Sequence, residues 1–408
     1  MMTVAEIRSQ FPQLNEKVYG KPLVYLDNAA TSLRPLSVIR KWDEMSSALS
    51  ANLHRAVHAI ANRATEEFES SRQAAADFIG AGSAEEIVFT SGATQGLNLV
   101  AFCLGEMKGF LKEGDEIIIG EAEHHSNILP WQFLAQRKGL TIKVLPVNDR
   151  GELRMEELPR LLGPAIKICC VAQVSNVLGV VNPVSEIAAL CHEKGCLLVV
   201  DGAQGVVHCK TSVSALGADF YAFSGHKLYA APGTGVLWGR KALLEQLPPY
   251  MGGGEMISTV KWSGSTFAPV PHKFEAGTQN MAGVPTMKPA FEFAESCMHL
   301  PETEKIMAFM LDALPRIGGL RLYGTPTDVS ARIPLFSFTV EGAHHEDLAL
   351  ILDKMGIAVR SGQMCAEPLM DRFGVTGMLR ASFAPYNTLE EAEYFVESLK
   401  KAVKMLKD

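Results

Sequence analysis

A lysine follows an apolar run near the middle of the chain. Lys227 closes Ser224-Gly225-His226-Lys227, directly after ADFYAF. In open α/β sheets, ligands bind beyond the carboxyl ends of the strands. A lysine amine that is partly desolvated there becomes nucleophilic near neutral pH, whereas a lysine on an ordinary surface stays solvated and charged. The pattern favours a Schiff-base lysine at Lys227, with the solvated surface residue as the alternative.

A second strand end carries a carboxylate. Asp201 ends the run CLLVVD, and a carboxylate at the end of a buried strand is costly without a cationic partner. The protonated pyridine nitrogen of pyridoxal phosphate is one such partner. An Asp that caps the next helix is the alternative. Together with the lysine run, the cofactor interpretation gains weight.

Two further strand ends suit a flat, phosphate-bearing ligand. The run FTSGATQG (89–96) places Thr94 at a helix N-terminus, whose backbone N–H groups can hold phosphate. His124, in EAEHHSN, follows another strand and could stack on a ring or be a structural residue. Metal ligation by His124, or by the pair His54 and His58, lacks a third ligand at a typical spacing, so no metal site is predicted.

The C-terminal part holds a thiol and a guanidinium. Cys365 lies in the polar loop RSGQMCAEPLM beside Arg360, and a nearby cation favours the reactive thiolate. An incidental loop cysteine is the alternative. Arg380, in MLRASF, lies within a predicted strand. Its guanidinium fits either a substrate carboxylate or a structural salt bridge.

The elements that must position these residues alternate along the chain. Near-continuous apolar strands are predicted at 85–90, 115–120, 141–147, 166–174, 196–201 and 219–224, and helices at 93–112, 126–138, 184–194 and 211–216. This alternation predicts a largely parallel sheet covered by helices on both faces. The Gly- and Pro-rich segment 245–285 predicts long irregular loops, and 286–314 predicts a helix.

Three regions follow from this pattern. An N-terminal helical segment is predicted over 1–20 from apolar residues at helical spacing, namely Val4, Ile7, Phe11 and Leu14. The large domain is predicted over 21–295. A smaller α+β domain is predicted over 296–408, and its last helix begins with a capping box of Thr388 and Glu391.

Composition narrows the class of protein. The 408 residues include 38 Lys plus Arg and 45 Asp plus Glu, so the net charge of -7 argues against nonspecific nucleic-acid binding. No apolar run approaches the roughly 20 residues of a membrane-spanning helix, and the first residues lack a signal-peptide pattern, so we expect a cytoplasmic protein without membrane partners. Most of the 8 cysteines lie in apolar runs and are expected to be buried, reduced thiols.

Nine ordered runs resemble the pyridoxal-phosphate cysteine desulfurases. The resemblance is to the SufS-like (group II) branch in particular, with the related selenocysteine lyases, and it extends from about residue 20 to the C-terminus. The runs are YLDNAATS (25–32), EHHSNILPWQ (123–132), VSNVLGVVNPV (174–184), VDGAQ (200–204), FSGHKLY (223–229), PPYMGGGEMI (248–257), FEAGT (274–278), RSGQMCAEPLM (360–370) and RASFAPYNT (380–388).

The resemblance implies a fold and an assembly. The fold is the α/β fold-type-I architecture of pyridoxal-phosphate transferases, which is aspartate aminotransferase-like. Its large domain binds the cofactor and contains a mostly parallel seven-stranded sheet, and its smaller C-terminal domain is α+β. The implied assembly is a homodimer with active sites at the subunit interface.

The resemblance also implies roles for individual residues. At the ring of the cofactor, Lys227 forms the Schiff base and later moves the substrate α-proton, Asp201 pairs with the pyridine nitrogen, and His124 stacks on the ring. Gln204 hydrogen-bonds the phenolic oxygen. The phosphate is held by Thr94, Ser224 and His226, and Thr278 reaches the phosphate of the neighbouring subunit. Around the substrate, Arg380 binds the carboxylate, Asn176 and Arg360 lie near it, and Cys365 attacks the sulfur.

The implied activity is that of a cysteine desulfurase. L-cysteine gives L-alanine, and Cys365 takes the sulfur as a persulfide. A sulfur-acceptor protein of the SufE/SufU type then receives it for assembly of iron–sulfur clusters or another thio-cofactor. The alternatives are a selenocysteine lyase acting on L-selenocysteine, another class V aminotransferase or lyase, and a non-catalytic protein that retains the fold.

Two positions depart from the branch's usual pattern. The SufS-like branch usually carries two histidines before the cysteine, where this chain has Gln363 and Met364. The phosphate turn usually carries two threonines, where this chain has Ala93 and Thr94, so one hydroxyl contact is expected to be missing. The short segment around Cys365 favours the branch with a structured loop and a dedicated acceptor.

Overall fold

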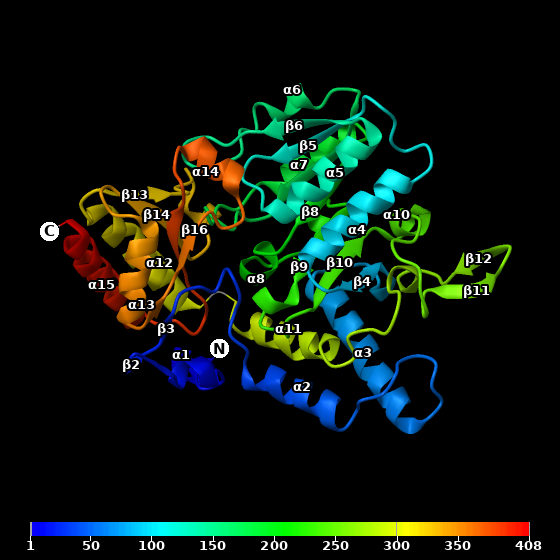
Figure 1. Ribbon diagram of the computed structural model, residues 1–408, viewed down its shortest axis with the longest axis horizontal. Helices are drawn as coiled ribbons and strands as arrows, with labels where there is room; N and C mark the ends of the chain where they lie inside the picture. Colours follow the sequence, from blue (N-terminus) through cyan, green and yellow to red (C-terminus); the bar gives the residue numbers. More distant parts are fainter. Residues whose placement is uncertain (1, 299, 408) are drawn as a thin grey trace.

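The computed structural model describes residues 2–298 and 300–407 and has a large and a small domain (Figure 1). The large domain is built on a seven-stranded sheet, as the resemblance implied. Its strand order is β4 (Ile87–Thr90), β10 (Gly235–Gly239), β9 (Phe220–Ser224), β8 (Leu197–Asp201), β7 (Ile166–Ala172), β5 (Glu116–Gly120) and β6 (Thr141–Leu145). β10 runs antiparallel to both neighbours, and the other pairs are parallel.

Side chains alternate between the two faces of this sheet, as strand geometry requires. On β8, Leu198 and Val200 point into one core, and Val199 points into the other. The first core also contains α3 (Ala59–Phe78), α7 (Val184–Glu193) and α11 (Met287–Ser296). The second contains α4 (Ala93–Glu106) and α5 (Leu129–Lys138). Because both faces are buried, the strands read as the near-continuous apolar runs seen in the sequence.

The remaining large-domain helices are short except for α2. They are α2 (Leu36–Ser47), α6 (Leu158–Leu161), α8 (Gly205–His208), α9 (Val213–Leu216) and α10 (Lys241–Gln246). The predicted helices at 93–112 and 126–138 are shorter than expected, because α4 ends at Glu106 and the 3-10 helix η3 (His125–Asn127) precedes α5.

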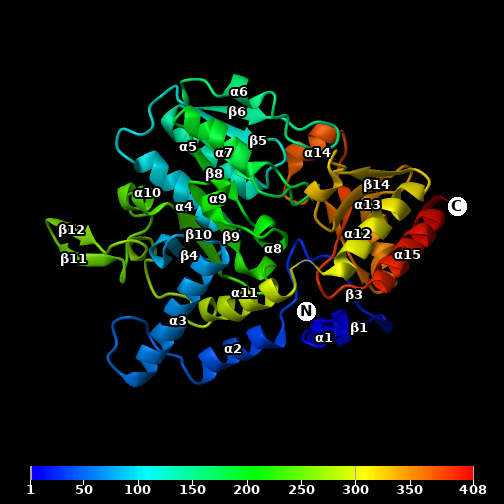
Figure 2. The same ribbon diagram turned by 180° about the vertical axis from the view of Figure 1, so that it is seen from behind.

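The small domain is an antiparallel sheet packed on helices. Its strands are, in order, β13 (Leu320–Tyr323), β14 (Leu335–Val340), β17 (Met378–Ser382) and β16 (Arg360–Gly362). Its helices are α12 (Pro301–Ala313), α13 (His345–Lys354), α14 (Glu367–Phe373) and α15 (Leu389–Lys407), with α12 lying beside α15 (Figure 2). Thr388 and Glu391 exchange backbone hydrogen bonds of 3.2 Å at the start of α15, which confirms the predicted capping box.

The N-terminal segment contacts both domains. α1 (Val4–Arg8) and the 3-10 helix η1 (Pro12–Asn15) place Ile7, Phe11 and Leu14 in the large-domain core. A small hairpin of β1 (Lys17–Val18) and β2 (Lys21–Pro22) follows, so the helical pattern ends before residue 20. β3 (Val24–Tyr25) then pairs in parallel with β15 (Ile357–Ala358) of the small domain. The chain from 24 to 26 therefore packs with the small domain, although the predicted division assigns it to the large one.

Two local predictions were wrong. The segment 245–285 contains a hairpin of β11 (Ile257–Lys261) and β12 (Gly264–Phe267), which projects from the large domain (Figure 1). The predicted helix at 286–314 is interrupted between α11 and α12. Pro301 is the first residue of α12, a position that needs no backbone N–H, whereas inside one long helix it would remove a hydrogen bond.

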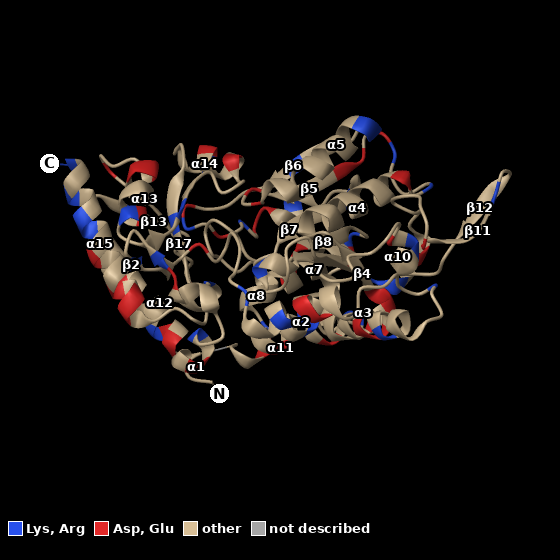
Figure 3. Cartoon of the chain, turned by 60° about the horizontal axis from the view of Figure 1, so that its bottom comes forward, with Lys and Arg blue, Asp and Glu red and all other residues tan. Residues whose placement is uncertain are grey.

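Charged residues, apolar helices and cysteines are distributed as follows. Basic and acidic residues are interspersed along α3, whereas on α15 the acidic residues lie towards its start and the basic residues towards its end (Figure 3). No helix among the described residues is long and apolar enough to cross a membrane. All 8 cysteines carry free thiols, and 6 of them are buried.

The start of β10 depends on glycine. A Cβ on Gly235 would lie 2.5 Å from the Cα of Gly92 and 2.7 Å from the carbonyl oxygen of Phe223. These atoms belong to backbone that cannot move aside cheaply, and Gly92 begins the turn that leads into α4. The absence of a side chain here therefore sets how closely two strand ends approach.

We expect Gly235→Ala to lower the free energy of unfolding by about 1–3 kcal/mol, because the added methyl group overpacks this junction. Gly163→Ala is the matched control, since a Cβ there meets no atom within 4 Å. Urea unfolding of both variants measures the difference. Equal stability of the two variants would contradict the conclusion that the start of β10 requires glycine at position 235.

Candidate active site

A cavity of about 220 Å³ lies where the strand ends of the large domain meet the small domain. Ten of the twelve residues singled out in the sequence line it. They are Thr94, His124, Asn176, Asp201, Ser224, His226, Lys227, Arg360, Cys365 and Arg380. Six of them come from the large domain at or just after the carboxyl ends of strands, the placement expected for ligand binding in such sheets; they are Thr94, His124, Asp201, Ser224, His226 and Lys227.

Lys227 ends the 3-10 helix η4 (Gly225–Lys227), which continues directly from β9. Gly225 allows this tight turn, because a Cβ there would lie 2.2 Å from Thr234 Oγ1. Among the described residues, no carboxylate forms an ion pair with the Lys227 amine. Burial lowers the pKa of Lys227, while Asp201 opposes this effect and Arg380 adds to it. Lys227 therefore loses its proton more readily than an exposed lysine, which gives the neutral, nucleophilic amine.

Asp201 lies at the end of β8, fully inside the large domain. Its Oδ1 accepts a hydrogen bond of 2.9 Å from the backbone N–H of Ala203. Burial raises its pKa, and the Lys227 cation opposes the rise. This hydrogen bond is the backbone contact that a helix-capping Asp would make. The carboxylate also lines the cavity, where it has no basic ion-pair partner among the described residues. A cationic nitrogen in the cavity would compensate its burial.

The N-terminus of α4 opens onto the same cavity. Gly92, with φ of 153°, turns the chain from β4 into the helix. Ser224 Oγ accepts a hydrogen bond of 2.8 Å from the N–H of Ala93, and the hydroxyl groups of Thr94 and Ser126 are 2.7 Å apart. The helix start therefore presents backbone N–H groups and hydroxyl groups, which suit a phosphate. Ala93 contributes no hydroxyl, as its sequence departure implied.

His124 is fixed between β5 and α5. Its Nδ1 accepts a hydrogen bond of 3.0 Å from the N–H of Ser126, so its proton lies on Nε2. Burial, together with the Lys227 cation, lowers the pKa of His124 to about 4. The preceding residue, Glu123, is buried and accepts hydrogen bonds of 2.7 Å from Asn127 and 2.8 Å from the N–H of Ala172. This arrangement holds a neutral imidazole ring at the cavity wall.

His226 is held by the N-terminal loop at 27–32. The hydroxyl groups of Thr31 and Ser32 donate to its backbone carbonyl at 3.2 and 3.0 Å, and Thr31 Oγ1 lies 3.2 Å from its Nδ1. Burial lowers the pKa of His226 to about 4. The loop therefore positions the peptide directly before Lys227.

Arg380 projects from β17 of the small domain and is buried. Its Nη1 donates to the Asn176 carbonyl at 2.8 Å, and its Nη2 forms a 3.3 Å ion pair with Asp27. Its Nε is buried and has no hydrogen-bond partner among the described residues. Arg380 therefore forms the structural salt bridge that was one of the two alternatives. Its Nε–H remains as a hydrogen-bond donor without a partner among the described residues. Arg360 is exposed and lies 4.0 Å from Asp27.

Cys365 lies in the turn between β16 and α14, at the cavity opening. Met364 and Cys365 have φ values of 52° and 55°, a conformation that non-glycine residues rarely adopt. The large domain holds this strained turn: Asn176 Nδ2 donates to the Met364 carbonyl at 2.8 Å, and the N–H of His125 donates to the Cys365 carbonyl at 2.7 Å. Cys365 is exposed, whereas the other cysteines are buried or half-buried.

Gln204 and Thr278 do not line this cavity. Gln204 is buried, and its Nε2 donates to the Ala29 carbonyl at 2.8 Å. Thr278 lines a second cavity of about 230 Å³, together with Ser91 and Gln95. Their implied contacts with a cofactor therefore remain predictions, and that of Thr278 requires a second subunit.

Three groups at the site were not predicted from the sequence. Asp27 binds Arg380, Ser126 pairs with Thr94, and the hydroxyl groups of Thr31 and Ser32 hold the lysine turn. Asp27, Thr31 and Ser32 lie in the run YLDNAATS, and Ser126 lies in EHHSNILPWQ, so the motifs contained the residues. Their roles depend on contacts between segments far apart in the chain, which a motif does not reveal.

The family model for class-V aminotransferases matches residues 24–395, so the chain belongs to that family. Its members are pyridoxal-phosphate enzymes. The chain is 43% identical over 412 residues to a probable cysteine desulfurase of Vibrio cholerae, covering 100% of both chains. It is 44% identical over 407 residues to a cysteine desulfurase of Yersinia pseudotuberculosis, covering 99% of both chains.

Solved structures agree with these relatives. The cysteine desulfurase CsdA of Escherichia coli is similar with a TM-score of 0.89 and 37% identity, covering 99% of both chains. The apo cysteine desulfurase of Thermococcus onnurineus is similar with a TM-score of 0.93 and 37% identity, again covering 99% of both chains. The similarity confirms the fold-type-I architecture that the sequence runs implied.

We expect Asp27→Ala to lower the free energy of unfolding by about 1–3 kcal/mol, because it leaves the buried Arg380 cation without its carboxylate partner. Asp149→Ala is the matched control, since Asp149 pairs with Arg372 at 3.0 Å but is 85% exposed. Its loss should change stability by less than about 0.5 kcal/mol. Chemical denaturation measures both variants, and an Asp27→Ala protein as stable as the control would refute this role for the ion pair.

Proposed function

We propose that this protein is a pyridoxal-phosphate-dependent cysteine desulfurase that converts L-cysteine to L-alanine and places the sulfur on Cys365. The observation that carries the proposal is the shared cavity: the Lys227 amine, the Arg380 guanidinium and the Cys365 thiol all line it. A lysine and an arginine suit amino-acid chemistry in general, whereas an exposed thiol at the opening suits sulfur transfer in particular.

The residues present fit pyridoxal phosphate. The buried Asp201 carboxylate makes no ion pair among the described residues, as expected for a group that pairs with a pyridinium nitrogen. The N-terminus of α4, with Thr94 and Ser224, forms a cradle for the phosphate, and the flat ring of His124 provides a stacking surface. When bound, the cofactor supplies an electron sink for the charge that develops at the substrate Cα.

The chain's own residues supply binding and proton transfer. Arg380 holds the substrate carboxylate through its unpaired Nε, and Asn176 lies beside it. Lys227 provides the amine that anchors the cofactor and then takes the proton from Cα. Its lowered pKa favours the neutral amine that both tasks require.

Cys365 completes the reaction. Its thiolate attacks the substrate sulfur, the Cβ–S bond breaks, and a new S–S bond forms on the enzyme. The thiol proton and the substrate thiol proton are shared between the alanine product and the Cys365 persulfide, so that cysteine plus thiol gives alanine plus persulfide. No external oxidant or reductant is needed.

The sulfur then passes to a second protein. Cys365 is exposed, so a thiol of an acceptor of the SufE/SufU type can reach the persulfide. We include in the proposal delivery to iron–sulfur cluster or other thio-cofactor assembly. We also propose a homodimer in which Thr278 reaches the phosphate site of the partner subunit. Val57, in the loop before α3, and Trp262, at the tip of the β11–β12 hairpin, are exposed apolar side chains that a second subunit could cover. Sedimentation should give twice the chain mass.

We expect purified holoenzyme to release alanine from L-cysteine and Lys227→Ala to release none, because no other amine lines the cavity among the described residues. Lys194→Ala, which changes an exposed lysine, is the matched control and should keep the wild-type rate. Alanine is measured directly, with L-selenocysteine assayed in parallel. Turnover of L-selenocysteine alone would replace the proposal with the selenocysteine-lyase alternative, and wild-type turnover by Lys227→Ala would refute the role of Lys227.

We expect Arg380→Ala to raise KM for L-cysteine by about 10- to 150-fold, the equivalent of a charged hydrogen bond worth about 1.5–3 kcal/mol. Steady-state kinetics measure KM, and thermal unfolding checks that the variant is folded. A folded variant with an unchanged KM would place the substrate carboxylate elsewhere.

A further inference from the structure

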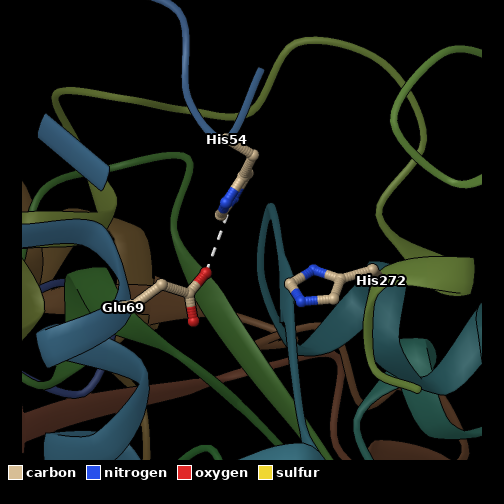
Figure 4. A group of neighbouring side chains, drawn as sticks. All are labelled: His54, Glu69 and His272. Carbon is tan, nitrogen blue, oxygen red and sulfur yellow. Dashed lines mark ion pairs between the residues drawn. The ribbon is translucent and has the colours of Figure 1, made fainter. Parts of the chain in front are cut away.

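Three side chains with metal-binding atoms converge outside the active-site cavity (Figure 4). His54, Glu69 and His272 each offer one ligand atom, and these atoms all lie within 4.8 Å of one another. His54 Nε2 is 3.5 Å from Glu69 Oε1. None of the three lines the cavity of Lys227 and Cys365. Their convergence therefore needs an explanation that is separate from the proposed reaction.

The three residues come from segments that are far apart in the chain. His54 lies in the loop between α2 and α3, Glu69 lies within α3, and His272 begins the 3-10 helix η5 (His272–Phe274). His58, which the sequence offered as a ligand together with His54, instead caps α3, where its Nδ1 accepts a hydrogen bond of 3.2 Å from the N–H of Ala61. The missing third ligand is supplied by the fold rather than by local spacing.

The donor set suits a zinc ion. Two imidazoles and one carboxylate are ligands of Zn²⁺ in open, four-coordinate sites, whereas Mg²⁺ and Ca²⁺ prefer oxygen donors throughout. Tetrahedral coordination at zinc bond lengths places ligand atoms about 3.4 Å apart. The distance between His54 and Glu69 already matches this spacing. The His54 side chain is 23% exposed, so an ion can reach it from solvent.

Neighbouring residues position the carboxylate. Arg72 donates to both oxygens of Glu69, at 2.8 and 3.1 Å, and fixes the orientation of the group. Such hydrogen bonds to a ligating carboxylate are a usual feature of metal sites. Arg72 also donates to both oxygens of Glu275, at 2.6 and 2.9 Å. One guanidinium is therefore shared by two carboxylates. The group of Arg72, Glu69 and Glu275 has a net negative charge, which favours a bound cation.

The backbone at His54 is consistent with a constrained ligand. His54 has φ of 64°, a conformation that costs energy in a non-glycine residue. Its N–H donates to Thr65 Oγ1 at 3.0 Å, and its ring packs edge-on against Phe68, with 6.0 Å between ring centroids. These contacts turn the imidazole towards α3 and η5.

We propose that His54, Glu69 and His272 form a zinc-binding site that joins the loop before α3 to the segment at η5. The fourth position is open to water. The ion cross-links three segments of the large domain, and the adjacent Arg55–Glu255 ion pair of 3.0 Å extends this link to the loop before β11.

The test is zinc binding by the full-length holoenzyme, measured by titration calorimetry, with bound metal counted after dialysis. Because the Cys365 thiol also binds zinc, the Cys365→Ser protein is titrated in parallel to identify that contribution. We expect His54→Gln and His272→Gln each to remove one zinc per chain or to weaken that site at least tenfold. His58→Asn, which keeps a capping oxygen, should bind zinc as the wild type does, and Mg²⁺ should not compete.

Thermal unfolding provides the second measurement. Zinc should raise the Tm of the wild type and of His58→Asn but not that of the two ligand variants, since an ion that binds only the folded state stabilises it. The proposal is overturned if folded His54→Gln and His272→Gln bind zinc as the wild type does. It is also overturned if the only zinc bound by the wild type is lost in Cys365→Ser, or if His58→Asn loses the site.

Discussion

The Arg380 guanidinium, buried between the two domains, is the interaction on which the arrangement of the site depends. It extends from a small-domain strand and is held by Asp27 of the N-terminal loop and by the carbonyl of Asn176 in the large domain. Three segments of the chain are therefore tied to one charge. A buried cation is tolerated only when it is paired and hydrogen-bonded, so this contact fixes the segments relative to one another.

The same contact brings the reactive groups into one place. Asn176 holds the Met364 carbonyl with its side chain while its own carbonyl binds Arg380, and so it joins the cysteine turn to the arginine. The N-terminal loop that supplies Asp27 also supplies Thr31 and Ser32, which hold the turn of Lys227. The same hydrogen bonds to backbone carbonyls therefore position the thiol, the amine and the guanidinium relative to one another.

Burial gives these groups their chemical character. It lowers the pKa of Lys227 and of His124, and it raises that of Asp201, so each group is shifted towards its neutral form. The free amine is the form that attacks a carbonyl. The buried Asp201 carboxylate is costly to leave unpaired, and a cationic cofactor nitrogen would stabilise it.

Much of the large domain could be predicted from the sequence, because buried parallel strands are continuous apolar runs and their ends carry the polar residues. Lys227, Asp201 and Thr94 were identified in this way. The pyridoxal-phosphate interpretation was drawn from Lys227 and Asp201 and was strengthened by the resemblance to a family, whereas the seven-stranded sheet and most of the detailed roles of the residues came from that resemblance. Asp27 and the cluster of His54, Glu69 and His272 could not be found, since their partners are far away in sequence. The β11–β12 hairpin was missed because its flanking glycines and prolines indicate loops.

The most direct test of the account is the location of the sulfur after a single turnover with L-cysteine, determined by peptide mass spectrometry. The account predicts one added sulfur atom on the peptide that contains Cys365 and none on the peptide of Cys209, the half-buried cysteine that serves as an internal control. Alanine release without sulfur on Cys365, at a rate that Cys365→Ala leaves unchanged, would contradict it.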